Sequence, residues 1–186
     1  RLTGLTHLSF PGDKIDDISA LTNLTELTSL SFTTTQSGTI SIQPLTEMTK
    51  LESLKIWGNF SDITPLANMA NLNDLELRGD FVDIASLANL TKLEKLHLFG
   101  NFSDITALAD MTDLTELYLM GNVTDITPLA GLSAVNKLIL CDNRIADITS
   151  LGKLVSLTDL RLSNNEIGDL SPLAGLTNLH RLDLKE

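Results

Sequence analysis

The sequence contains little cysteine, few aromatic residues and few basic residues. Its one cysteine, Cys141, excludes an internal disulfide framework, which fits either a reducing cytosol or a bacterial extracellular protein that avoids disulfides. No apolar run is long enough to span a bilayer, and no segment reads as a signal peptide. The net charge of −11 argues against nucleic acid and anionic membranes as partners, because both require basic patches.

Aromatic residues make up only 4% of the chain, while hydrophobic residues make up 42%. The core must therefore be almost entirely aliphatic. A chain of 186 residues would ordinarily form one globular domain or two. The spacing of its leucines leads to a different expectation.

One apolar frame, L-x-x-L-x-L-x-x-N, recurs along nearly the whole chain. Its units open at Leu5, Leu27, Leu51, Leu72, Leu93, Leu114, Val135, Leu157 and Leu179, with spacings of 22, 24, 21, 21, 21, 21, 22 and 22 residues. This frame at a period in the low twenties is the signature of a leucine-rich repeat solenoid. Because each solenoid unit packs only on its neighbours, we expect a single domain over residues 1–186, with nine strand units and no internal boundary.

The pattern inside one unit predicts a short strand. In the unit that opens at Leu114, Leu117 and Leu119 alternate with Glu116, Tyr118 and Met120, which is the period of two that places one face inward. The expected fold is α/β: a leucine-rich repeat solenoid, a curved right-handed coil with a parallel β-sheet on its concave face. Short 3₁₀ or helical turns would form the convex face.

Neither end of the chain carries the polar cap that a solenoid needs. Leu2 already occupies the last apolar position of a preceding unit, and the chain stops at Glu186, directly after a strand. We therefore expect a fragment of a longer protein, or a chain whose caps were removed. The uncovered final strand, with Leu182 and Leu184, predicts end-to-end self-association.

Two polar positions recur at the corners of the coil. An asparagine ends many strands, and its amide is expected to turn inward and bond the backbone of the turn. These asparagines are Asn59, Asn101, Asn122, Asn143 and Asn165. An aspartate precedes the return segment in every complete unit but the second, and it is expected to accept hydrogen bonds from backbone donors there. These aspartates are Asp17, Asp62, Asp83, Asp104, Asp125, Asp147 and Asp169.

The same return segments suggest two further roles. The hydroxyls of Thr64, Thr127 and Ser171 each precede a proline, which predicts that they cap a short helix or 3₁₀ turn. The alternative for the aspartates is an acidic ladder that binds calcium. One carboxylate per strand does not by itself build a cage of six or more oxygens, so we favour the structural role.

Four consecutive units, which open at Leu51, Leu72, Leu93 and Leu114, are one residue shorter than the others. In each, a glycine precedes the Asn or Asp, and a large apolar residue follows it directly. These apolar residues are Phe60, Phe81, Phe102 and Val123. We predict that the phenylalanines fill the interior after the deletion, which makes them core residues.

Segments such as NVTDITPLAGLSAVNKLIL and NEIGDLSPLAGLTNLHRLDL closely resemble internalins, the leucine-rich repeat proteins on the surface of Listeria and related Gram-positive bacteria. The resemblance covers essentially the whole chain, and the D-I-[ST]-P-L-A return segment is fairly specific. The cytosolic phosphatase-regulator class of eukaryotes shares the 22-residue frame but has a longer helical return segment. The run of 21-residue units departs from the internalin pattern and leaves any particular receptor open.

No motif in the chain indicates catalysis or a cofactor. His7, His97 and His180 lie far apart in the predicted stack, and no His/Cys/Asp set has the spacing of metal ligands. Cys141 and His97 lie two strand steps apart, about 10 Å, which is too far for a hydrogen bond that activates a thiol. We therefore expect a protein that is not an enzyme and binds no cofactor or metal.

The outward positions of the strands predict an apolar patch in the middle of the concave sheet. It consists of Phe99, Met120, Cys141, Tyr118 and Ile139, with a charged rim of Lys55, Glu76, Arg78, Asp159 and Arg161. The residues predicted to bind the partner, which we call the concave patch, are Trp57, Arg78, His97, Phe99, Tyr118, Met120, Ile139 and Cys141. Folding gives no reason for aromatic residues at solvent-facing positions, and Trp, Tyr, Met and Arg are favoured at interfaces. Sheet propensity alone is the alternative explanation. Cys141 would serve as a small apolar contact, or form an intermolecular disulfide.

The sequence thus predicts a non-catalytic module that binds a protein through its concave sheet. If the resemblance to internalins extends to function, the module belongs to a secreted or cell-wall-attached bacterial protein, and its partner is a host surface receptor or another extracellular protein. Two alternatives stay open. The domain could be a rigid spacer that displays other domains, or an intracellular scaffold of the phosphatase-regulator type.

Overall fold

The computed structural model describes residues 4–11, 15–34 and 38–185. Within these residues, nine strands form one sheet in the order of the sequence. They are β1 (His7–Phe10), β2 (Ser29–Thr33), β3 (Ser53–Trp57), β4 (Asp74–Arg78), β5 (Lys95–Phe99), β6 (Glu116–Met120), β7 (Lys137–Ile139), β8 (Asp159–Arg161) and β9 (Arg181–Asp183). All neighbouring pairs are parallel, so every connection crosses to the other face of the sheet.

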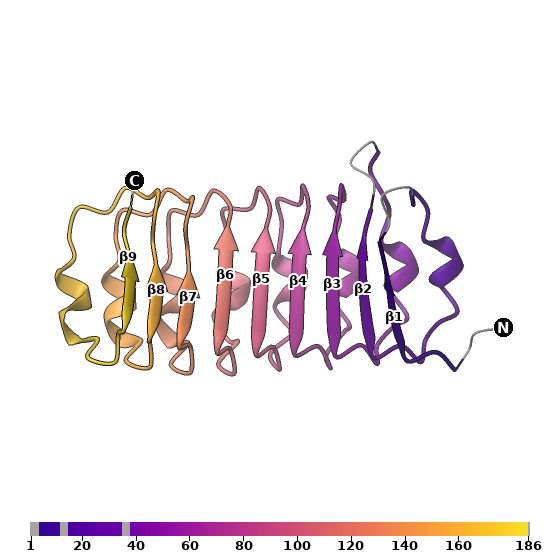
Figure 1. Ribbon diagram of the computed structural model, residues 1–186, viewed down its shortest axis with the longest axis horizontal. Coiled ribbons are helices and arrows are strands. Elements are labelled where there is room, and N and C mark those ends of the chain that lie inside the picture. Colours follow the sequence, from indigo (N-terminus) through magenta and orange to yellow (C-terminus); the bar gives the residue numbers. More distant parts are fainter. Residues whose placement is uncertain (1–3, 12–14, 35–37, 186) are drawn as a thin grey trace.

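Short 3₁₀ turns make these crossings behind the sheet, as Figure 1 shows. The described residues contain eight of them. They are η1 (Ser19–Leu21), η2 (Gln43–Leu45), η3 (Thr64–Leu66), η4 (Ala85–Leu87), η5 (Thr106–Leu108), η6 (Thr127–Gly131), η7 (Thr149–Lys153) and η8 (Ser171–Gly175). The predicted leucine-rich repeat solenoid, with strands on one face and 3₁₀ turns on the other, is confirmed. Leu2 and Glu186, on which the expectation of missing caps partly rests, lie outside the described residues.

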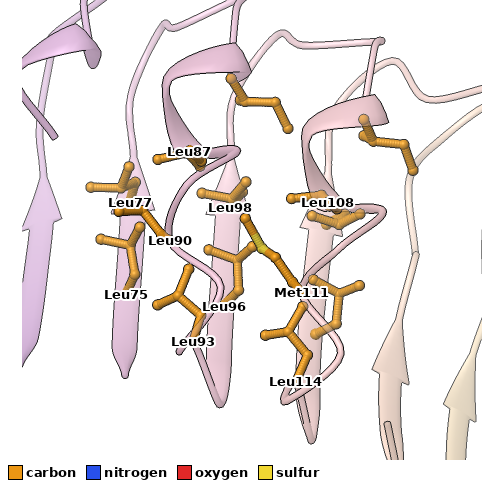
Figure 2. Packing of buried hydrophobic residues seen from close by; sticks show 14 of the residues in the cluster. Leu75, Leu77, Leu87, Leu90, Leu93, Leu96, Leu98, Leu108, Met111 and Leu114 are labelled. Carbon is orange, nitrogen blue, oxygen red and sulfur yellow. The ribbon is translucent and has the colours of Figure 1, made fainter. Parts of the chain in front are cut away.

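The core is a continuous column of aliphatic side chains between the sheet and the return segments. Strand register superposes equivalent leucines, so that Leu75 pairs with Leu96 and Leu77 with Leu98. Return-segment residues such as Leu87, Leu90 and Met111 meet them from the other side (Figure 2). All of these side chains are 0% exposed. The burial of each unit against the next is the main force that holds the array together.

The aspartate of each return segment holds the corner where the chain turns back. In all seven units the carboxylate accepts a hydrogen bond from the backbone N–H two residues later, at 2.7–2.9 Å. In the second unit the hydroxyl of Ser41 takes this place and accepts from the N–H of Gln43 at 3.3 Å. The predicted structural role of the aspartates is confirmed.

The predicted capping by hydroxyls is wrong. The residue before each 3₁₀ turn is an apolar one, such as Ile63 or Ile126, and no side chain caps the turn from that position. Thr64 instead donates its hydroxyl to Asp62, at 2.6 Å, and Ser171 donates to Asp169. The aspartate, two residues before the turn, already accepts from the first N–H, so the hydroxyl supports the carboxylate.

The phenylalanines of the short units lie in the core, as predicted. Phe60, Phe81 and Phe102 are 0% exposed and stack on one another, with ring centroids 5.9 and 5.8 Å apart. Each ring lies against the glycine of the following unit. A Cβ atom on Gly100 would come within 2.9 Å of both the ring and the carbonyl oxygen of Phe81. These units need glycine because of this close approach.

The expectation that every strand-ending asparagine turns inward is wrong for the short units. In the longer units Asn143 and Asn165 do turn inward, as expected, and the Nδ2 atom of each donates to carbonyl groups of the turn. Asn101 is exposed, and Asn59 and Asn122 are only half-buried. In the short units the following phenylalanine or valine takes the inward place, and the Asn101 N–H bonds the Phe81 carbonyl directly. The Phe81 carbonyl is therefore paired without a side-chain amide, whereas Asn122 Nδ2 donates outside the core to the Asn101 carbonyl at 3.3 Å.

Candidate protein-binding face

The register of the sheet places the predicted concave patch in two adjacent rows. One row contains His97, Tyr118 and Ile139, which are successive partners on β5, β6 and β7. The other row contains Trp57, Arg78, Phe99 and Met120, which are partners from β3 to β6. Cys141 lies two residues beyond Ile139, half-buried, with a free thiol. The structure therefore brings all eight residues onto one face of the solenoid.

The most exposed members of the concave patch are Trp57 and Arg78. Trp57 is 46% exposed, and its Nε1 donates a hydrogen bond to Glu76 Oε1 at 2.9 Å. The Arg78 guanidinium lies over the Phe99 ring, 6.0 Å from its centroid. The two side chains are held in place on one side while their other sides stay open to solvent.

His97 forms the polar centre of the patch. Its ring stacks on Tyr118, with centroids 4.0 Å apart, and lies between two carboxylates. Nδ1 is 3.9 Å from Glu76, and Nε2 is 3.4 Å from Glu116 but forms no hydrogen bond with a described residue. Burial lowers the pKa of His97 below its ordinary value, although both carboxylates act in the opposite direction. Burial therefore favours the neutral form of the imidazole.

Ion pairs between and along strands surround His97 and Tyr118. Lys137 Nζ is 2.9 Å from Glu116 Oε1 and 4.8 Å from the centre of the Tyr118 ring. Burial raises the pKa of Glu116, but the hydrogen bond and charge of Lys137 outweigh it, so its net pKa lies below the ordinary value. Most charged groups of the rim are thus neutralised by a neighbour, which leaves the aromatic surface as the distinctive feature of this face.

A groove of about 820 Å³ runs along the carboxyl ends of the strands, beside the second row of the patch. The four glycines of the short units, Gly58, Gly79, Gly100 and Gly121, line it, and we call it the glycine groove. Trp57, Arg78, Phe99 and Met120 line one side. Asn59, Asp80 and Asn101, which follow the glycines directly, also line it.

Sequence reasoning missed the glycine groove because it treated the glycines only as a mark of the shortened units. The signal was present: four glycines recur at one repeat position, and a column without side chains on a sheet edge leaves a channel. It also placed Asn59 and Asn101 in the interior, whereas both line the groove.

Within the described residues, no three His, Cys, Asp or Glu side chains gather in a way that could hold a metal ion. The described part of the chain also contains no helix that is long and apolar enough to cross a membrane. What the face offers chemically is aromatic surface, one guanidinium and a channel lined by backbone. These are features suited to contact with another macromolecule.

Comparison with known proteins identifies the repeat. Residues 133–175 and 155–186 match the family model for leucine-rich repeats, which describes two copies of the unit. The chain belongs to the leucine-rich repeat proteins. This fold is typical of protein–protein interaction modules. This leucine-rich repeat protein has no significant match among the curated proteins searched.

Among solved structures, this leucine-rich repeat protein is similar to two internalins of Listeria monocytogenes. Internalin C2 is 31% identical with a TM-score of 0.86, over 98% of this chain and 82% of that one. Internalin F is also 31% identical with a TM-score of 0.78, over all of this chain and 62% of that one. The ectodomain of a plant receptor kinase from Arabidopsis thaliana, solved in complex with Casparian strip integrity factor 2, is 23% identical with a TM-score of 0.78. It covers 98% of this chain and 24% of that one, and at this identity it shows the shared fold alone.

Proposed function

We propose that this leucine-rich repeat domain is a non-catalytic recognition module of an internalin-like bacterial protein, secreted or attached to the cell wall. Its partner is a host surface receptor or another extracellular protein. The concave patch is the docking surface, with Trp57, Phe99, Tyr118 and Met120 as anchors and charged side chains around them. The identity of 31% to two internalins supports the family assignment.

One observation carries the proposal: an exposed tryptophan and arginine, with the partly exposed Phe99 and Tyr118 beside them, lie on a face where folding does not require them. The leucines of β3 to β6 are fully buried on the other side of the sheet, so the core is complete without Trp57 or Phe99. Interfaces concentrate binding energy in such residues, at the centre of a patch with a polar rim.

The test is a screen of the domain against a panel of extracellular host proteins, with the wild type beside a Phe99→Glu/Tyr118→Glu variant. The variant places two charges where two aromatic anchors would be buried in the complex, which should weaken binding by at least about 100-fold. Val82→Glu/Val155→Glu is the matched control, because it adds the same charges at residues that are 67% and 55% exposed and outside the patch.

We expect the control to bind like the wild type, and thermal unfolding should confirm that all three proteins are folded. A partner that binds the patch variant as tightly as the wild type would place the interface on another face. The absence of any partner would favour the rigid spacer.

A further inference from the structure

The glycine groove coincides with the four short units. Each of these units has glycine at the position after the strand, because the phenylalanine of the unit before occupies the space of a Cβ atom for Gly79, Gly100 and Gly121. In the two longer units that follow, the same position holds Asp142 and Asn164, with positive φ angles of 57° and 55°. Asp142 lies at the end of the groove. From Gly79 to Gly121 the phenylalanines of the core therefore require an edge of the sheet without side chains.

The dimensions of the groove suit an extended chain. From Trp57 to Met120 it crosses three strand steps, which is roughly 14 Å at about 4.8 Å each, or four to five residues of extended backbone. No described backbone N–H donates a hydrogen bond to the carbonyl oxygens of Gly58, Gly79, Gly100 or Gly121. These carbonyls are therefore left without a backbone partner among the described residues, and the glycines put no side chains in the way of a bound main chain.

Arg78 sets the charge that the groove selects. Lys55, Lys137 and Arg161 on the same face each lie within 3.1 Å of a carboxylate. Arg78 forms no ion pair among the described residues, although the chain has 24 acidic residues against 13 basic ones. Its neighbour Glu76 accepts a hydrogen bond from Trp57 instead. An exposed guanidinium held over an aromatic ring keeps its N–H edge free for a carboxylate.

The remaining lining restricts how much negative charge the ligand carries. Asp80 and Asp142 line the same groove, so a run of carboxylates would be repelled. Trp57, Phe99 and Met120 flank Arg78 in its row and provide apolar surface on both sides. The complementary ligand has one carboxylate with aromatic or aliphatic side chains next to it.

We propose that the glycine groove binds an extended segment of a partner protein, in which a single Asp or Glu pairs with Arg78 and adjacent apolar side chains pack on Trp57, Phe99 and Met120. This inference rests on the proposed function and names the chemistry of the partner segment. It assigns to the edge of the sheet a role distinct from that of His97 and Tyr118, which lie in the other row.

The experiment is a selection of phage-displayed random dodecapeptides on the domain, followed by titration of the enriched peptides. Trp57 is the only tryptophan of the chain and lines the groove, so its fluorescence reports occupancy directly. We expect peptides with one acidic residue beside aromatic or aliphatic ones. Their affinity should fall about tenfold or more in Arg78→Gln, as a charged hydrogen bond requires. Lys95→Gln is the matched control, because Lys95 is another sheet-face cation without an ion pair among the described residues, outside the groove.

Three results would overturn the inference: no enriched peptide, enrichment of basic or uncharged sequences, or binding that Arg78→Gln leaves unchanged. Different results would contradict the proposed function. A host protein that is lost with Phe99→Glu/Tyr118→Glu but kept with Arg78→Gln would support the patch and reject the groove. Peptides that depend on Arg78, without any host partner in the panel, would support the groove and reject the host-receptor proposal.

Discussion

Asn143 and Asn101 occupy the same position of their repeat units, yet their side chains have different environments. Asn143 is only 8% exposed; its Oδ1 accepts from the N–H groups of Gly121 and Val123, and its Nδ2 donates to the Leu119 and Leu140 carbonyls. The side chain of Asn101 has no such bonds and is exposed. The residue type is the same, and one extra residue after Asn143 decides which way the amide points.

This difference predicts opposite outcomes for the same substitution. Asn143→Ala should lower the free energy of unfolding by at least about 2 kcal/mol, because it leaves buried N–H and C=O groups without partners. Asn101→Ala should change it by less than about 0.5 kcal/mol. Urea denaturation of both variants measures this. Equal losses would mean that Asn101 is also structural.

At the scale of the element, the short units depend on two positions together: the large apolar residue of one unit and the glycine of the next. The phenylalanine takes the inward place directly after the asparagine or aspartate, and the ring then contacts the glycine of the next unit. The phenylalanine requires the glycine, since a larger residue in place of Gly100 would collide with Phe81. The stack of Phe60, Phe81 and Phe102 is therefore tied to the glycine column, and so to the groove.

We expect Gly100→Ala to destabilise the domain by about 1–3 kcal/mol, because the added Cβ would lie 2.9 Å from backbone and ring atoms of Phe81. Gly131→Ala is the control, because its Cβ would be no closer than 3.7 Å to any other residue outside its neighbours. That variant should stay within about 0.5 kcal/mol of the wild type. Thermal and urea unfolding give both values, and a neutral Gly100→Ala would contradict the close-approach explanation.

At the scale of the whole molecule, the same hydrogen bond is repeated along the solenoid and produces a collective response to pH. Hydrogen bonds from the following backbone N–H and hydroxyl lower the pKa of six aspartates of the return segments: Asp17, Asp62, Asp104, Asp125, Asp147 and Asp169. A lowered carboxyl pKa stabilises the fold above the ordinary value of 3.8, and this contribution is lost as the pH falls below it. His97 affects the stability in a different, higher pH range.

The stability of the domain should therefore fall in two steps on acidification. The lowered pKa of His97 means that the unfolded chain binds its proton first, so stability is lost as the pH falls from about 6.5 through the folded pKa. The aspartates add a second loss below about pH 4. Urea denaturation from pH 8 to 3 measures both. His97→Gln should abolish the first step and keep the second, and an unchanged first step would show that another group causes it.

By itself the sequence determined the features that depend on spacing within one unit. The alternation around Leu117 and Leu119, the aspartate before each return segment and the phenylalanines of the short units are local patterns. Repetition then places equivalent residues on the same face. The nine-stranded solenoid, its buried leucines and the rows of the concave patch could therefore be predicted.

Only the tertiary structure decided how residues of different units meet. Pairs such as His97 with Glu116, Lys137 with Tyr118 and Arg78 with Phe99 join residues about one repeat apart, and depend on register and side-chain direction. The inward or outward direction of Asn143 and Asn101 depends on how the backbone of each turn satisfies its hydrogen bonds. The glycine groove depends on where side chains are missing from a surface that several units share. A linear pattern contains the residues of each unit, but contacts across strands and the space between them exist only in the folded stack.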